Sequence, residues 1–290
     1  MIETDSHLLE ASLPAVEQAH VALATLADKQ IITYRAAGDQ HAPAIVLLHG
    51  IGSSSAGYRG QFASLSEHHR VIAWDAPGYG QSSPFAIGTP TATDYADALM
   101  ALLSTLGISH ATVVGSSWGS VVAATFATRY PSATGALVMS APNVARGHLS
   151  GSERDAAREA LLRSGAAQSA AARVAVVDAL IAPNASAQVR ALVSQLRDAV
   201  TPTGWEHAVG MLFSTYTPSV MPSIQAPVSV IIGSLDRVAP IDDHARPIHE
   251  AAPGSTLHVL DAIGHMPKLE RPATFNSIVL AAAAVWCAPD

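Results

Sequence analysis

The pentapeptide Gly-Ser-Ser-Trp-Gly at residues 115–119 constrains the fold of this chain more than any other feature, because of what flanks it. It directly follows the apolar run 111–114, which predicts a short buried strand, and it directly precedes a helical stretch at 120–129. A strand that turns sharply into a helix can hold a serine on a strained turn, with its hydroxyl pointing out of the sheet. The two glycines carry no Cβ and leave room for that turn. The pattern predicts Ser117 as a nucleophile, although small residues that simply end a buried strand would look similar.

A second apolar run, residues 44–48, predicts another buried strand and is followed by His-Gly-Ile-Gly-Ser-Ser at 49–54. An enzyme that transfers acyl groups holds the oxyanion of a tetrahedral intermediate with preorganised backbone N–H groups. We expect one of these donors from Trp118, which follows the predicted nucleophile, and the other from Ile51 in this turn. His49 is expected to have no chemical role, and a purely structural loop is the alternative interpretation.

A nucleophilic serine also needs a base and a group that orients the base. Residues 227–233 predict a buried strand whose following loop carries Asp236, and residues 256–260 predict a last strand that is followed by His265. The strand ends of an open parallel sheet share one edge, so these two side chains can converge on Ser117. We expect His265 to accept the serine proton and Asp236 to hold the imidazole tautomer.

Two other carboxylates, Asp242 and Asp243, compete with Asp236 for the acid position. Asp236 is preferred because it lies in the first turn beyond its strand. The other position at which an acid could follow a strand holds Asn143, which cannot supply the charge.

Five segments of the chain resemble, in order, motifs of the α/β-hydrolase fold superfamily, in its esterase, lactonase and C–C hydrolase branch. They spread over most of residues 30–290 and are HGIGSS at 49–54, DAPGYGQS at 75–82, GSSWGS at 115–120, GSLDRVAP at 233–240 and GHMPKLERP at 264–272. The resemblance implies a Ser-Asp-His triad and chemistry without a cofactor.

Several residues of this chain differ from those typical of particular hydrolase classes, and these differences reduce the number of candidate functions. C–C hydrolases of ring-fission products commonly carry Trp directly after and four residues after the catalytic His, where this chain has Met266 and Leu269. Ser117 excludes the dehalogenases, which use Asp as nucleophile, and Trp118 argues against cofactor-free haloperoxidases. The function of an enol-lactonase remains a candidate. The expected function is hydrolysis of carboxylic esters, with an enol-lactonase or a C–C hydrolase as alternatives and a non-catalytic small-ligand receptor less favoured.

Residues 6–29 are expected to form an N-terminal helix, after which residues 31–35 open the sheet. Further strands are predicted near 44–48, 71–74, 111–115, 136–140, 228–232 and 256–260, with helices between them. This alternation is typical of an α/β fold with a doubly wound, mostly parallel sheet.

The alternation stops at residues 143–222, which are rich in alanine and show no strand pattern. Helices are predicted there, with breaks at Pro183 and Pro202, over 153–162, 170–181 and 186–200. We interpret this stretch as a helical cap over the strand ends, with ordinary packing helices as the alternative. The predicted division is therefore a hydrolase core at 1–142 and 223–290 and a cap at 143–222.

A cap of this kind lines a pocket above the nucleophile with large apolar side chains. The predicted substrate contacts are Trp205, Met211, Phe213 and Met266. They suit an apolar acyl or alcohol group of modest size. Charged acids are expected to be poor, because basic cap residues such as Arg146 and Arg163 lie in polar or surface contexts.

The composition of the chain says more about its binding partners than about the reaction that it catalyses. The net charge is −7 without a basic cluster, which argues against nucleic acid. Hydrophobic residues make up 49%, yet no apolar stretch approaches the roughly 20 residues of a membrane span. The acidic N-terminus does not resemble a signal peptide, so a cytoplasmic protein is expected. Neither a metal nor a cofactor is expected, the partner is a small ester or lactone, and the oligomeric state stays open.

Overall fold

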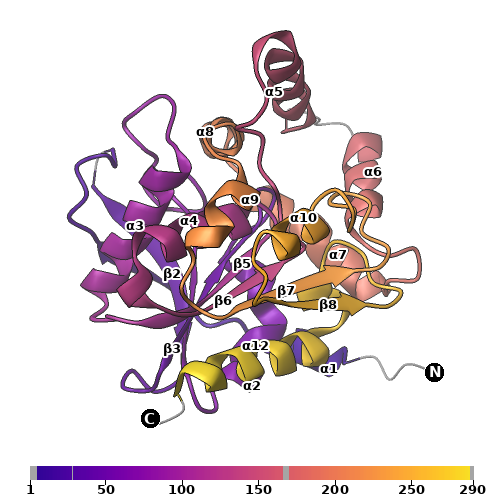
Figure 1. Cartoon of the computed structure of the whole chain (residues 1–290). Coiled ribbons are helices and arrows are strands. Elements are labelled where there is room, and N and C mark those ends of the chain that lie inside the picture. The colour runs from indigo at the N-terminus through magenta and orange to yellow at the C-terminus, as the bar shows by residue number, and fades with distance from the viewer. Residues whose placement is uncertain (1–4, 28, 166–169, 288–290) are drawn as a thin grey trace.

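The computed structural model describes residues 5–27, 29–165 and 170–287. Its centre is an eight-stranded sheet in the order β1-β2-β4-β3-β5-β6-β7-β8 (Figure 1). The two strands β1 and β2 run antiparallel to their neighbours, and the pairs from β4 to β8 are parallel. The strands are β1 Val16–His20, β2 Ile31–Ala37, β3 Ala44–Leu48, β4 Arg70–Trp74, β5 Ala111–Ser116, β6 Thr134–Ser140, β7 Val228–Gly233 and β8 Thr256–Leu260.

Helices cover both faces of the sheet, which explains why its central strands are apolar without alternation. In β3, Ile45 and Leu47 pack into the core of one face, while Val46 and Leu48 pack into the core of the other. The first of these faces is covered by α2 (Arg59–Leu65) and α12 (Pro272–Cys287), with α1 (His7–Glu10) beside them. The second is covered by α3 (Ala92–Thr105), α4 (Trp118–Arg129), α9 (Thr217–Val220) and α10 (Ala245–Glu250). The doubly wound, mostly parallel sheet predicted from the sequence is confirmed.

The predicted N-terminal helix over residues 6–29 is wrong. Among the described residues of this range, only His7–Glu10 is helical, and β1 pairs antiparallel with β2, with Val16 opposite Arg35 and His20 opposite Ile31. Proline disfavours the helix interior, and Pro14 lies between the two elements. Beyond it, the unpaired edge of β2 offers backbone partners that outweigh a local helix preference.

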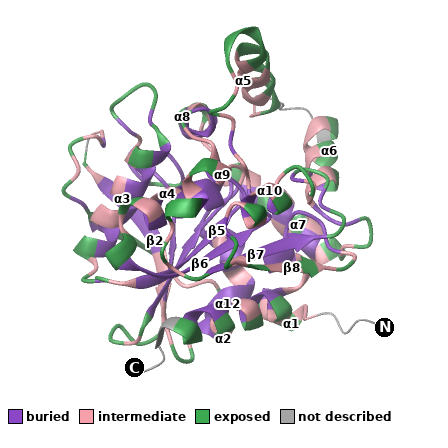
Figure 2. Ribbon diagram, viewed as in Figure 1, coloured by how far each residue is buried: buried purple, intermediate pink, exposed green. Residues whose placement is uncertain are grey.

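A helical segment stands above the carboxyl ends of the parallel strands (Figure 1). It contains α5 (Gly151–Gly165), α6 (Ala170–Leu180), α7 (Ala187–Leu196) and α8 (Pro202–Leu212). The sheet is buried throughout its centre, whereas α5 is exposed along much of its length (Figure 2). The inserted helical cap is thus confirmed, while the predicted domain boundaries stay a prediction.

The helix α8 was not predicted, because Pro202 was interpreted only as a break. Proline is favoured at the first position of a helix, where its missing N–H costs nothing. The Thr201 hydroxyl caps this end by accepting a hydrogen bond from the N–H of Gly204 at 2.9 Å. Within the described residues, no helix is both long and apolar enough to cross a membrane.

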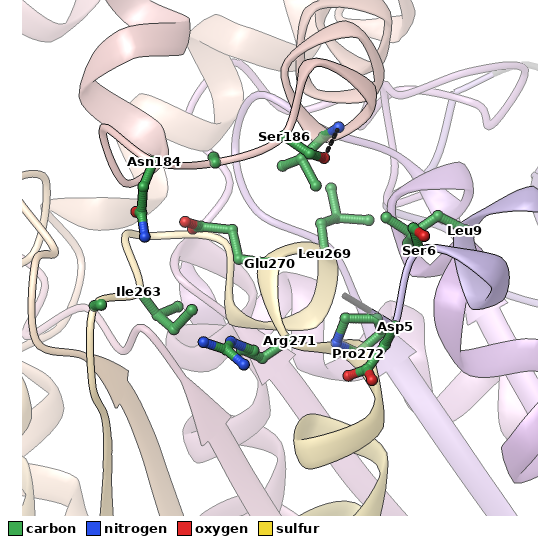
Figure 3. A pocket seen from close by; sticks show the side chains of 13 residues that line it. Asp5, Ser6, Leu9, Asn184, Ser186, Ile263, Leu269, Glu270, Arg271 and Pro272 are labelled. Atoms are coloured by element: carbon green, nitrogen blue, oxygen red, sulfur yellow. Dashed lines mark hydrogen bonds between the residues drawn. The ribbon is translucent and has the colours of Figure 1, made fainter. Parts of the chain in front are cut away.

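The short helix α11 (Pro267–Glu270) lies between two cavities. One of them, about 310 Å³ in volume, opens beside α1 and the start of α7 (Figure 3). Leu9, Leu269 and Arg271 are among the residues that line it. Ser117, Asp236 and His265 do not line this cavity, so the predicted site must be sought on the other side of α11.

Candidate active site

Ser117 lies between β5 and α4 on a strained turn. Its backbone dihedrals are φ 53° and ψ −116°, a conformation that L-residues rarely adopt. The turn is held on both sides, since the Ser117 N–H donates to the carbonyl of Ser140 at 2.8 Å and the Ser117 carbonyl accepts from the Ser120 hydroxyl at 2.6 Å. The backbone strain is therefore maintained by surrounding contacts, as expected of a nucleophile held out from a sheet.

The two glycines of the pentapeptide are required by close contacts. A Cβ on Gly115 would lie 2.4 Å from the carbonyl oxygen of Gly119. A Cβ on Gly119 would lie 2.4 Å from the carbonyl oxygen of Leu48. Both distances are too short for any side chain, so the turn, the helix and the neighbouring strand β3 fit together only with glycine at these positions.

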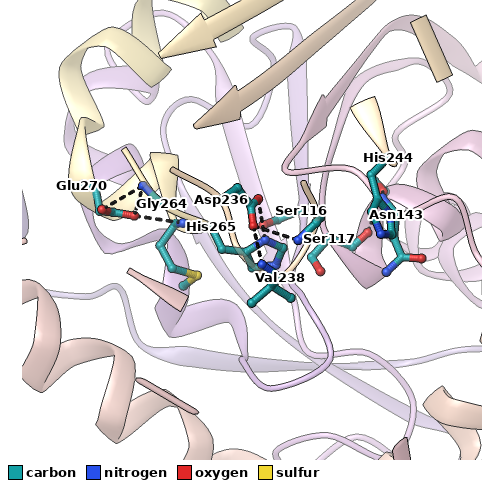
Figure 4. A network of polar contacts seen from close by, with 12 residues as sticks. Ser116, Ser117, Asn143, Asp236, Val238, His244, Gly264, His265 and Glu270 are labelled. Atoms are coloured by element: carbon teal, nitrogen blue, oxygen red, sulfur yellow. Dashed lines mark hydrogen bonds and ion pairs between the residues drawn. The ribbon is translucent and has the colours of Figure 1, made fainter. Parts of the chain in front are cut away.

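Asp236 and His265 follow the ends of β7 and β8 and form a buried pair. The His265 Nδ1 lies 2.8 Å from Asp236 Oδ2, and the two side chains are 4% and 0% exposed (Figure 4). The other carboxylate oxygen, Oδ1, accepts hydrogen bonds from the N–H groups of Val238 and Ala239 at 2.9 and 2.8 Å. Because the carboxylate accepts at Nδ1, that nitrogen carries the proton in the neutral imidazole and Nε2 keeps a free lone pair.

The loop that carries His265 is tied to the cap by Glu270, which the sequence analysis did not single out. The Glu270 carboxylate accepts from the N–H groups of Gly264 and Met266 at 3.1 Å and from that of Ala182 in the cap at 2.8 Å. Burial raises the pKa of the Glu270 carboxyl, although these three hydrogen bonds act in the opposite direction. The contacts fix the histidine loop against the end of α6.

The competing acids do not occupy the position of Asp236. Asp242 is exposed and pairs with Arg246 at 2.8 Å, and Asp243 is exposed as well. Asn143 accepts from the N–H of Ala145 at 2.8 Å and so caps its own turn. Of the predicted alternatives, the structure brings Asp236 to His265.

The two predicted oxyanion donors come from two different turns near Ser117. Trp118 is the first residue of α4, so its N–H is one of the four at a helix start that lack an intrahelical acceptor. In the described part of the chain, the N–H of Ile51 donates to no backbone acceptor, and Ile51 lines a cavity together with Ser117. The Tyr79 hydroxyl holds the Ile51 carbonyl at 2.9 Å and thereby fixes this turn.

His49, for which no chemical role was predicted, is a structural residue. It is fully buried, its Nδ1–H donates to the Gly50 carbonyl at 2.9 Å, and its Nε2 accepts from the N–H of Ala76 at 3.1 Å. Burial lowers the pKa of the imidazole, which favours this neutral form. Both nitrogens are used in holding neighbouring loops together.

A cavity of about 290 Å³ joins the predicted nucleophile and base to the cap. Ser117 and His265 line it from the core side. From the cap side it is lined mainly by apolar side chains, among them Leu161, Val176, Leu180, Val193, Leu196 and Trp205. The predicted contact Met266 also lines it.

The predicted contacts Met211 and Phe213 do not reach this cavity. Met211 is fully buried and Phe213 is 3% exposed in the hydrophobic core beneath the cap, and Arg154 stacks over the Phe213 ring at 5.5 Å. The sequence could not separate these residues from Trp205, because composition shows which residues are apolar but not which of them face the cavity. Trp205, on the same helix, does face the cavity.

Two cationic residues that the sequence analysis did not select also line the cavity, Lys268 and Arg197. Lys268 is 1% exposed and its Nζ donates to the Ser116 hydroxyl at 2.7 Å. Burial lowers the pKa of the Lys268 ammonium to about 7. Its neighbours Met266 and Leu269 are apolar, and this was the one sequence signal that could have indicated its burial.

The buried Lys268 is expected to make stability depend on pH. In the unfolded chain its pKa returns to about 10.5, so between about 7 and 10.5 the unfolded state binds a proton that the folded state does not. The free energy of unfolding should therefore rise with pH in this window, by at most about 1.4 kcal/mol per pH unit from this group. Urea unfolding of the wild type and of Lys268→Met at several pH values measures the effect, as the change with pH in the difference between their free energies of unfolding. A difference in the free energy of unfolding that does not change with pH would contradict this prediction.

Comparison with known proteins agrees with this architecture. The family model described as alpha/beta hydrolase fold matches residues 43–272. An uncharacterized protein of Mycobacterium tuberculosis is 33% identical over 277 residues, covering 85% of this chain and 76% of that protein. A 2-hydroxy-6-oxononadienedioate/2-hydroxy-6-oxononatrienedioate hydrolase of Paraburkholderia phymatum is 31% identical over 261 residues, covering 81% of this chain and 85% of that protein.

Solved structures share the fold at lower identity. A thermophilic esterase of Thermogutta terrifontis superposes with a TM-score of 0.80 at 20% identity, over 94% of this chain and 100% of that one. The enol-lactonase of Burkholderia xenovorans superposes with a TM-score of 0.77 at 22% identity, over 92% of this chain and 100% of that one. The same scaffold therefore carries more than one hydrolytic specificity, and the specificity must be argued from the cavity.

Proposed function

The chain belongs to the alpha/beta-hydrolase fold family, and on this premise we propose that it is a serine hydrolase that cleaves carboxylic esters through an acyl-enzyme on Ser117. The observation that carries the proposal is the convergence of three strand ends at one cavity. The strained Ser117 and the imidazole of His265 line that cavity, and Asp236 holds the far side of the imidazole at 2.8 Å. Each member of a nucleophile, base and orienting acid is thus supplied by a different loop.

In the proposed mechanism, His265 Nε2 accepts the proton of the Ser117 hydroxyl as its oxygen attacks the ester carbonyl. The N–H groups of Ile51 and Trp118 stabilise the oxyanion that forms. The protonated imidazole, held by Asp236, then gives its proton to the departing alcohol. Water that is deprotonated by His265 attacks the acyl-enzyme, and the acid leaves as Ser117 regains its proton.

The cavity supports esters of small to medium size with an apolar part. Its volume of about 290 Å³ and its lining of Leu, Val and Trp side chains favour hydrocarbon over heavily hydrated groups. A C–C hydrolase is the second candidate, since a relative named as such is 31% identical, and an enol-lactonase is the third, on the shared fold. One observation argues against the C–C hydrolase. Where those enzymes commonly carry a second Trp, four residues after the catalytic His, this chain has Leu269, which lines the cavity on the other side of α11 and not that of Ser117. A cytoplasmic location and catalysis without a cofactor stay predictions.

The acyl specificity is expected to follow the size of the cavity. A buried methylene contributes about 0.8 kcal/mol, so kcat/KM should rise several-fold with each added carbon until the cavity is full. A series of para-nitrophenyl esters from acetate to decanoate measures this dependence. A flat profile would contradict an acyl-binding cavity of this size.

A pair of variants on α6 tests whether the acyl group of the substrate binds in this cavity. Val176 lines the cavity, whereas Val174 on the same helix is 58% exposed. Val176→Phe should move the optimum to shorter acyl chains because it fills part of the space, and Val174→Phe should leave the profile unchanged. If the two variants behave alike, the acyl group lies elsewhere.

A further inference from the structure

The cavity at Ser117 has an unusual charge for this chain. The protein as a whole carries a net charge of −7, yet the described residues that line the cavity include two cations, Lys268 and Arg197, and no Asp or Glu. Arg197 also lines a neighbouring hollow on the cap and lies over the Trp205 ring at 5.8 Å, so it stands where the two spaces meet. Cationic side chains therefore lie both where the two cavities meet and beside Ser116, the residue before the proposed nucleophile.

Lys268 is the more informative of the two, because its charge is buried without compensation. Among the described residues it forms no ion pair within 4.0 Å, and burial is the only cause that shifts its pKa. Its contacts are neutral, namely the Ser116 hydroxyl at 2.7 Å and the face of the Tyr58 ring at 5.2 Å. A lysine ammonium has three N–H donors, and the Ser116 hydroxyl accepts from one.

Burying a charge without a partner costs several kcal/mol, and a methionine of similar length would fill the same space without that cost. Burial alone lowers the pKa of Lys268 to about 7, and a ligand that brings a negative charge into the cavity removes the penalty and favours the protonated ammonium. Lys268 and the proposed nucleophile Ser117 line the same cavity, so one ligand in this cavity can contact both residues.

We propose that Lys268 binds a carboxylate of the substrate, so that the enzyme prefers esters whose apolar part also carries one carboxylate. This inference rests on the proposed ester hydrolysis at Ser117. It replaces the expectation that charged acids are poor substrates. That expectation considered Arg146 and Arg163, and neither of these residues lines the cavity. Arg197, which lines the same cavity, adds to its attraction for anions.

The experiment compares two esters of equal acyl length, para-nitrophenyl hemiglutarate and para-nitrophenyl valerate, which differ in one carboxylate. A charged hydrogen bond contributes about 1.5–3 kcal/mol. The wild type should therefore have a kcat/KM about 10- to 100-fold higher for the hemiglutarate, and Lys268→Met should bring the ratio of the two kcat/KM values close to one. A second pair, the butyrates of para-hydroxybenzoate and para-hydroxybenzamide, shows whether the carboxylate lies on the acyl or the alcohol side.

Three further variants separate charge from structure. Lys29 is exposed, so Lys29→Met removes an equal charge from the surface and should leave both rates unchanged. Lys268→Gln keeps a donor for Ser116 but not the charge, and should lose the preference as the Met variant does. Lys268→Arg should retain part of it. Circular dichroism verifies the fold of each variant.

The proposal is overturned if the wild type does not prefer the carboxylate-bearing ester of either pair. It is also overturned if Lys268→Met lowers the rates of the charged and neutral esters equally, because Lys268 then only supports Ser116. If the wild type cleaves none of the four esters, the proposed function fails, and binding still decides the inference. Calorimetry with glutaramate and neutral glutaramide should then show tighter binding of the anion to the wild type but not to Lys268→Met, and equal binding of the anion to both proteins would refute it.

Discussion

Replacing Ser117 with alanine is expected to lower kcat for ester hydrolysis by about 10⁴- to 10⁶-fold, because the members of a triad act as a unit. The fold should be retained, since alanine keeps the Cβ and the backbone contacts of the turn to Ser140 and Ser120 remain. Steady-state kinetics with para-nitrophenyl butyrate and thermal unfolding of the same preparations measure both quantities. Ser277→Ala, on the exposed surface of α12, is the control and should match the wild type.

Turnover of Ser117→Ala within about tenfold of the wild type would remove Ser117 from the mechanism. A large drop in the unfolding temperature would instead assign the loss to folding. The two measurements together distinguish these outcomes.

Asp236→Asn is expected to lower kcat by roughly 10⁴-fold, because the amide favours the wrong tautomer of His265. The substitution keeps the size of the side chain, and Oδ1 can still accept from the N–H groups of Val238 and Ala239. Asp242→Asn is the matched control, since that carboxylate is 79% exposed and pairs only with Arg246 among the described residues. Its kcat should be nearly that of the wild type, as should that of Asp243→Asn.

A large loss at Asp242 or Asp243 with a small one at Asp236 would show that the orienting acid is misassigned. Comparable losses at all three positions would point to a general effect on the loop after β7.

The residues of the candidate site were predictable because their signals are local. The turn at Ser117 needs a buried strand before it, glycines within it and a helix after it, and all of these are adjacent in sequence. Asp236 and His265 were predicted from their place after strands, since the fold brings the ends of parallel strands together. Whether these three residues catalyse the reaction is a question for the variants above.

The features that the sequence did not predict correctly depend on contacts between distant parts of the chain. Residues 16–20 form a strand only because the edge of β2, about fifteen residues further along, offers them hydrogen bonds. Helical periodicity could not show that Trp205 faces the cavity while Met211 faces the core. The burial of Lys268 depends on Ser116 and Tyr58, which come from β5 and the turn before α2. No local pattern describes such an environment.

The most direct test of the central claim is covalent labelling with a serine-directed phosphonate followed by peptide mass spectrometry. The proposed mechanism predicts one phosphonyl group per chain, on Ser117, with loss of esterase activity in step with labelling. Ser117→Ala should not be labelled, and Asp236→Asn should be labelled much more slowly than the wild type. Stoichiometric labelling at another residue, or full esterase activity in a protein labelled at Ser117, would contradict the account.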